Sequence, residues 1–214
     1  MIVQNPIVGR SRNKLANTIF STWNGLNIVR SKPLSVANPQ TLAQRIQRAR
    51  TTVNAKFAKA FSAAILIGFR IKQVGQSARS QALKANYPAT FADPVTAEGH
   101  LTFADAVVSN GSMTPTPINT ASATAGSASV SVTFPTTTAD ASQASSDKMV
   151  LCVINGTTGT SAQSVGSKSR SDGLCSVSLP ETVVAGDDIH FYLFAFSVST
   201  SAVSDTAYAF DVAM

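Results

Sequence analysis

Apolar residues recur at helical spacing through residues 38–69, which predicts one long amphipathic helix. Asn38 is the expected N-cap, Pro39 takes the expected first helical position, and the first glycine of the segment is Gly68. When successive residues are placed about 100° apart, one side of this helix is apolar. This apolar face comprises Leu42, Ile46, Ala49, Val53, Phe57, Ala60, Phe61 and Ala64.

The rest of the helix surface divides into a charged part and an uncharged part. Beside the apolar face lies a narrow strip of four cations, which we call the basic face: Arg45, Arg48, Lys56 and Lys59. The third part carries small or uncharged side chains: Gln44, Gln47, Thr51, Asn54, Ala55, Ala58 and Ser62. The sequence leaves open whether this third part is solvated or packs against another subunit.

Two short segments before the helix, 17–23 and 26–31, flank the dipeptide Asn24-Gly25. A type I′ turn requires positive φ at both central residues, and this dipeptide suits that turn well, so the segments predict a β-hairpin. An isolated hairpin is marginally stable in water, so its apolar side chains need a partner surface. We expect the apolar face of the following helix to be covered by Phe20, Trp23, Ile28 and Val29.

The second half of the chain has patterns typical of β-strands, some with alternating apolar and polar residues and some continuously apolar. Strand patterns occur at 128–134, 149–154, 174–179, 189–198 and 202–213. About seven short strands at this spacing favour an antiparallel β-sandwich of Ig-like type. The expected class is therefore α+β, with a basic hairpin-plus-helix region at 1–92, a linker and first strand at 93–127, and the β-sandwich domain at 128–214.

Charge is distributed very unevenly between these regions. The first 92 residues contain 14 Lys and Arg and no Asp or Glu, which gives +14, and the rest contains 3 basic and 11 acidic residues, which gives −8 and a net charge of +6. A cationic segment without internal countercharge repels itself and favours binding to a polyanion or to an acidic neighbouring chain. The competing interpretation is that the basic face is merely solvated.

The residues expected for catalysis are scarce. The two histidines are His100, in a predicted loop, and His190, within an aromatic strand where a structural role is the better interpretation. No Walker loop, nucleophile elbow, dinucleotide fingerprint or set of metal ligands at the required spacing is present. We therefore expect no enzymatic activity, no cofactor, no metal and no small-molecule substrate.

The lack of a recognisable signal peptide and the small number of cysteines fit the expectation that the protein stays inside the cell in which it is made. The N-terminus lacks the apolar core of a signal peptide, and the apolar run at 60–69 is too short to span a bilayer. We therefore expect no membrane partner. Cys152 and Cys175 lie in predicted strands and can be bonded or free; without export, two buried free thiols are the preferred interpretation.

The segment from Thr22 to Pro33, TWNGLNIVRSKP, resembles a signature of an uncharacterised protein family of similar length from Bacteroidota and their phages, catalogued as a domain of unknown function. The family pattern is close to S-W-x-G-x-N-x-x-R-S-x-P, so Thr22 departs from it slightly. Weaker resemblance continues at 42–45, 67–69, 148–155, 170–180 and 186–196. The resemblance implies a shared arrangement of hairpin, long helix and β-domain, with no activity and no catalytic residues.

These observations together favour a self-assembling virion structural protein, the coat protein of a small phage. Its expected partners are further copies of itself and RNA or single-stranded DNA, and its expected location is the virion, assembled in the host cytoplasm. The residues expected to contact nucleic acid, without reading base sequence, are Arg10, Arg12, Lys14, Arg45, Arg48, Lys56 and Lys59.

Three other functions fit the sequence less well. One is a non-enzymatic binding or adhesion module with an Ig-like domain, which requires export. Another is a small enzyme that uses His100 or His190. The last is a DNA-organising protein of the host cell, which would bind without forming closed shells.

Overall fold

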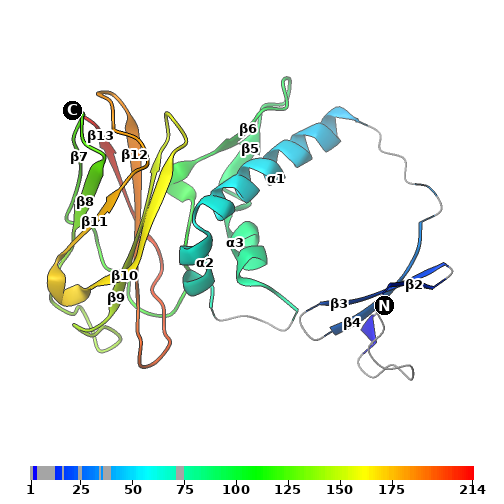
Figure 1. Ribbon diagram of the computed structural model, residues 1–214, viewed down its shortest axis with the longest axis horizontal. Coiled ribbons are helices and arrows are strands. Elements are labelled where there is room, and N and C mark those ends of the chain that lie inside the picture. The colour runs from blue at the N-terminus through cyan, green and yellow to red at the C-terminus, as the bar shows by residue number, and fades with distance from the viewer. Residues whose placement is uncertain are drawn as a thin grey trace.

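Two continuous apolar segments form the central strands of the protein, β9 (Lys148–Asn155) and β12 (Asp188–Phe196). They pair antiparallel in a four-stranded sheet of order β10-β9-β12-β13, with β10 at Ser161–Ser169 and β13 at Ala207–Val212. The structure is a computed structural model that describes residues 2–3, 13–15, 17–23, 26–33, 35, 40–70 and 75–214. Figure 1 shows this sheet between a second sheet and the helices.

Both faces of β9 and β12 are buried, which explains why these segments are apolar at almost every position. On one face, alternate residues such as Leu151 and Phe191 pack toward the second sheet, of order β11-β8-β7. Its strands are β7 (Thr120–Ala123), β8 (Ser129–Thr133) and β11 (Leu174–Ser178). On the other face, residues such as Cys152, Tyr192 and Phe194 pack toward the helices.

The predicted long helix is two helices. α1 (Leu42–Ala60) begins with Thr41 as its N-cap, whose hydroxyl accepts a 3.4 Å hydrogen bond from the Gln44 amide. The predicted N-cap at Asn38 is therefore wrong; Asn38 and Pro39 lie outside the described residues. Phe61 leaves helical geometry, with φ −109° and ψ 35°, and α2 (Ser62–Gly68) follows. This break places the fully buried Phe61 ring in the core.

A third helix and a small hairpin complete the layer on this face of the sheet. α3 (Ala78–Asn86) starts at a capping box made by Ser77 and Ser80. The hairpin of β5 (Thr90–Ala92) and β6 (Gly99–Leu101) lies along α1, and the short helix η1 (Phe103–Asp105) follows it. A Cβ at Gly99 would lie 2.6 Å from the Ala49 carbonyl oxygen, so this close approach of β6 to α1 requires glycine.

The N-terminal sheet confirms the predicted hairpin and corrects its packing. β3 (Thr18–Trp23) pairs with β4 (Leu26–Ser31), flanked by β2 (Asn13–Leu15) and β1 (Ile2–Val3); Asn24 and Gly25 lie outside the described residues. Among the described residues, neither core contains a side chain of this sheet. The prediction that the hairpin covers the apolar face was wrong, because β9, β12 and the β5–β6 hairpin cover that face instead.

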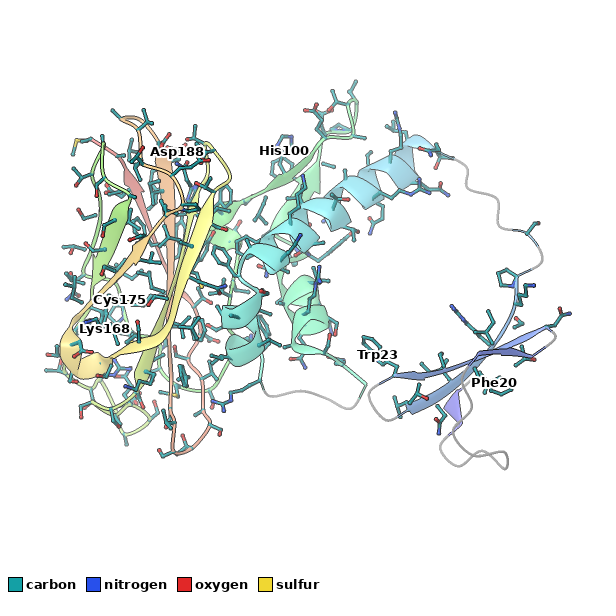
Figure 2. All side chains as sticks on the ribbon, in the orientation of Figure 1. Phe20, Trp23, His100, Lys168, Cys175 and Asp188 are labelled. Atoms are coloured by element: carbon teal, nitrogen blue, oxygen red, sulfur yellow. The ribbon has the colours of Figure 1, made fainter. Side chains whose placement is uncertain are left out.

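Trp23 shows where the N-terminal sheet meets the rest of the protein. Its side chain is 51% exposed, and its indole Nε1 donates a 2.8 Å hydrogen bond to the Gly75 carbonyl oxygen. Figure 2 shows Trp23 at the end of the sheet that faces the helices, while Phe20 lies farther out. Trp23 thus contacts the rest of the protein through a hydrogen bond at the surface and not through a buried ring.

The α+β class is confirmed, whereas the Ig-like assignment stays a prediction. The three predicted regions also stay a prediction, although β7 pairs with β8 and so brings part of the 93–127 region into the second sheet. The short helix η2 (Arg170–Asp172) connects β10 to β11. Cys152 and Cys175 are free and buried, and they belong to the two different cores.

Replacing Phe61 with Ala should lower the free energy of unfolding by about 3–5 kcal/mol, because the ring is fully buried. Replacing Trp23 with Ala should cost about 1 kcal/mol or less, since half of its surface is already exposed. Denaturant unfolding followed by circular dichroism measures both changes without relying on the single tryptophan. Similar losses for the two variants would show that the hairpin shares the main core.

Candidate nucleic-acid interface

The packing of α1 against the sheet turns its basic face toward solvent. Phe57 is buried against the aromatic side chains of the core, with ring centroids 5.1 Å from Phe61 and 5.6 Å from Tyr192. The basic face lies beside the apolar face and spans about 80° of arc, so it turns away from Phe57 and the core. All four of its side chains are exposed: Arg45, Arg48, Lys56 and Lys59.

Three of these cations line an open hollow of about 600 Å³, which we call the basic groove. The fourth cation of the groove is Arg79, which comes from the first turns of α3. The groove is lined by Gln47, Arg48, Thr51, Thr52, Ala55, Lys56, Lys59 and Arg79. Its charged residues are thus all positive, and its other side chains are uncharged.

The position of α3 depends on a buried amide of α1. Asn54 is 2% exposed, and its Nδ2 donates a 2.8 Å hydrogen bond to the Leu83 carbonyl oxygen in α3. This bond, together with the packing of Ala78 and Ala82 of α3 into the core beneath the helices, places Arg79 at the edge of α1. Arg79 was absent from the residues predicted for the site, since sequence spacing does not relate one helix to another.

The uncharged third face of the helix is divided between the interior and the groove. Asn54 and Ala58 are buried, so they do not form the subunit surface that was a possible interpretation of this face. Gln47 accepts a 2.8 Å hydrogen bond from the Tyr87 hydroxyl. Thr51 and Ala55 line the basic groove.

Two other arginines have structural roles that the sequence did not predict. Arg50 donates to the carbonyl oxygens of Thr90, at 2.9 Å, and Tyr87, at 3.1 Å, and its guanidinium lies 4.2 Å from the centre of the Tyr87 ring. Arg50 therefore ties α1 to the segment between α3 and β5. Arg170 is fully buried and pairs with Asp147, with 3.8 Å between Nη2 and Oδ2. Neither guanidinium belongs to the exposed basic surface.

The predicted contacts near the N-terminus remain predictions. Arg10 and Arg12 lie outside the described residues. Lys14 lies in β2, where its backbone is opposite Ile19. The structure therefore brings Arg48, Lys56 and Lys59 together with Arg79, and Arg45 lies on the same helix outside the lining of the groove.

The histidines make ring contacts. The Nδ1 of His190 lies 2.9 Å from the Tyr208 hydroxyl, and its ring stacks on Phe103 at 4.2 Å. Burial lowers the pKa of His190, which keeps the ring neutral, as suits a structural residue. His100 is exposed and stacks on Phe91 at 5.2 Å between centroids.

The described residues offer no further candidate for a functional site among their thiols, metal-binding side chains or helices. Burial raises the pKa of the Cys152 thiol and so opposes thiolate formation. In the part of the chain that the structure describes, no group of three His, Cys, Asp or Glu side chains is arranged to hold a metal ion. No helix in that part is long and apolar enough to cross a membrane.

The sequence profile of a family of unknown function, DUF6266, matches residues 9–209. This confirms the resemblance to a family without known activity; its Bacteroidota and phage origin and the signature at Thr22 to Pro33 stay predictions. No curated protein matches the sequence.

Replacing Arg50 with Gln should lower the free energy of unfolding by about 1–3 kcal/mol, because it removes charged hydrogen bonds to two carbonyl oxygens. Replacing the exposed Lys56 on the same helix with Gln is the matched control, and it should change stability by no more than about 0.5 kcal/mol. Denaturant titration of both variants distinguishes a structural cation from a groove cation. Equal effects would contradict this distinction.

Proposed function

The chain belongs to DUF6266, a family of unknown function, and we propose that it is a self-assembling phage coat protein whose basic groove binds the backbone of packaged nucleic acid. The observation that carries this proposal is the convergence of Arg48, Lys56, Lys59 and Arg79 on one open groove. No carboxylate lies among the residues that line it, and the first acidic residue of the chain is Asp93.

A phosphate backbone is the ligand class that suits this groove best. Residues Arg48 to Lys59 extend over about 16 Å of the α1 axis, which is enough to reach several successive phosphates. The side-chain amide of Gln47 adds hydrogen-bond donors for phosphate oxygens, whereas the Thr51 and Thr52 hydroxyls donate to carbonyl oxygens of α1. Contacts of this kind are independent of base sequence, as packaging of a whole genome requires.

The distribution of charge supports assembly as well as genome binding. Exposed acids occur after residue 92, among them Asp105, Asp172 and Glu181, while every exposed charged side chain in the described part of the first 92 residues is a cation. The acidic surface of one copy can therefore attract the basic surface of another. Because each copy carries both signs, subunit contacts and nucleic-acid contacts are compatible.

The N-terminal sheet supplies a second argument for contacts between copies. Its apolar side chains are only partly buried and, among the described residues, belong to neither core: Ile19, Phe20, Leu26, Ile28 and Val29. Such a sheet gains stability when another apolar surface covers it. We infer that a second copy of the chain provides this surface in the assembled particle.

Purified protein expressed alone in bacteria should form particles visible by electron microscopy, with an absorbance ratio that indicates bound nucleic acid. If it yields only small oligomers free of nucleic acid, the coat proposal is wrong. Binding of the isolated β-region to cells or glycans would favour the adhesion alternative.

The groove itself is tested by two double variants of equal charge. Lys59→Gln with Arg79→Gln removes one cation from each helix of the groove, and Lys84→Gln with Lys168→Gln removes two exposed cations outside it. The groove variant should reduce the slope of log affinity against log salt by about 1–2 for a single-stranded oligonucleotide. The control variant should leave the slope unchanged, and equal slopes for both variants would place the binding surface elsewhere.

A further inference from the structure

A second hollow lies beside the basic groove, on the opposite side of the basic face. It has a volume of about 350 Å³, and its walls come from α1, the β6–η1 segment and the β9–β10 region. We call it the apolar pocket. Its lining residues are Val53, Lys56, Phe57, Ala60, Gly99, His100, Leu101, Phe103, Ile154 and Gly159. Figure 2 shows His100 on the β5–β6 hairpin next to α1.

The aromatic walls of this pocket are held firmly in place. Phe57 packs edge-on against Phe61 and Tyr192 in the core. Phe103 is fixed twice, since its ring stacks on His190 and its carbonyl oxygen accepts a 2.9 Å hydrogen bond from the Tyr192 hydroxyl. Because these contacts come from the core and not from the open side of the pocket, a flat ring that enters the pocket requires little rearrangement of its walls.

Lys56 connects the pocket to the basic groove. It is the residue that lines both hollows, and on the helix it lies between Val53 and Phe57 on one side and Thr52 and Lys59 on the other. A ligand with a ring in the pocket would therefore have its charged group near Lys56, at the edge of the row of cations. His100 adds a second nitrogen-bearing side chain to the lining.

We propose that the apolar pocket receives one base of a single-stranded nucleic acid whose phosphates lie along the basic groove. This inference rests on the function proposed above and names the form of nucleic acid that the site takes. An aromatic-lined pocket beside a cationic groove is the combination that single strands use, because every base offers a face for stacking. A duplex keeps its bases paired and stacked, so it can reach the groove with its phosphates but cannot fill the pocket.

The charge at the pocket favours a nucleotide over an apolar side chain of a neighbouring copy. An apolar side chain would gain nothing from Lys56 or His100 and would take Lys56 out of water. A nucleotide that places its base beside the partly buried Phe103 and its phosphate near Lys56 uses both kinds of lining residue, while Phe57, only 3% exposed, closes the pocket on the side of the core.

The first test compares three probes of equal length on the full-length protein by fluorescence anisotropy. These are a single-stranded oligonucleotide, made in DNA and in RNA forms, the same strand with abasic sites, and a duplex. The single strand in either form should bind at least about fivefold more tightly than the abasic strand, as expected for one stacked base. Equal affinities for the intact and abasic strands, or for the single strand and the duplex, would overturn the pocket assignment while leaving the groove proposal intact. Failure of all three probes to bind would contradict the groove proposal too.

The second test fills the pocket. Ala60→Leu adds bulk to a lining residue, and Ala63→Leu makes the same change at an exposed position of α2 outside the pocket. The first variant should bind the intact strand only as well as wild type binds the abasic strand, and the second should bind like wild type. Thermal unfolding checks that both variants are folded, and if Ala60→Leu is not, the abasic comparison on the wild-type protein still decides. Unchanged affinity of folded Ala60→Leu would overturn the proposal.

Discussion

The packing of α1 and α2 on the outer face of β9 and β12 is the interaction on which the rest of the protein depends. The two strands alternate their side chains, so one set forms the core between the sheets and the other set forms the core beneath the helices. Phe57, Phe61 and Tyr192 meet edge-on in this second core. Because these rings fix the rotation of α1 about its axis, they also decide that the basic face points outward.

The same packing explains how a segment with so much like charge can fold. The charge of Arg50 is compensated within the fold by the carbonyl oxygens of Tyr87 and Thr90. The cations of the basic groove lie at the surface, where water and salt reduce their mutual repulsion. A polyanion in the groove would remove that repulsion, so electrostatics links the fold of the first 92 residues to their proposed function. The apolar pocket lies on the other side of the basic face, and Lys56 belongs to both surfaces.

Local sequence patterns predicted the features that depend on spacing and turn residues. The amphipathic character of α1 and its exposed basic face follow from a period of 3.6 residues. The hairpin follows from the Asn24-Gly25 dipeptide, and the buried strands follow from continuous apolar segments at 149–154 and 189–198, although the second strand ends at Phe196. The break at Phe61 does not follow from local sequence patterns, because it results from packing one aromatic ring into a core that also contains Phe57 and Tyr192. The partner of the apolar face was also predicted wrongly, since the nearest apolar segment in sequence is not the nearest in space.

The candidate site was predictable to a similar extent. Arg48, Lys56 and Lys59 share one helix face, so their spacing identified them. Arg79 joins them through the packing of α3 against α1, which includes the buried hydrogen bond between Asn54 and Leu83. The structural role of Arg50 depends on where the chain returns after α3, and the apolar pocket combines three segments that are distant in sequence. No periodicity within one element contains that information.

In the arrangement that we propose, single-stranded nucleic acid lies along α1 with a base in the apolar pocket. Ultraviolet crosslinking of the full-length protein to a single-stranded oligonucleotide, followed by mass spectrometry of the crosslinked peptides, tests it most directly. Crosslinks should form in the segments that contain Phe57 and Phe103, on either side of the pocket. Crosslinks confined to the strands of the β-domain, such as β10 and β11, would contradict it.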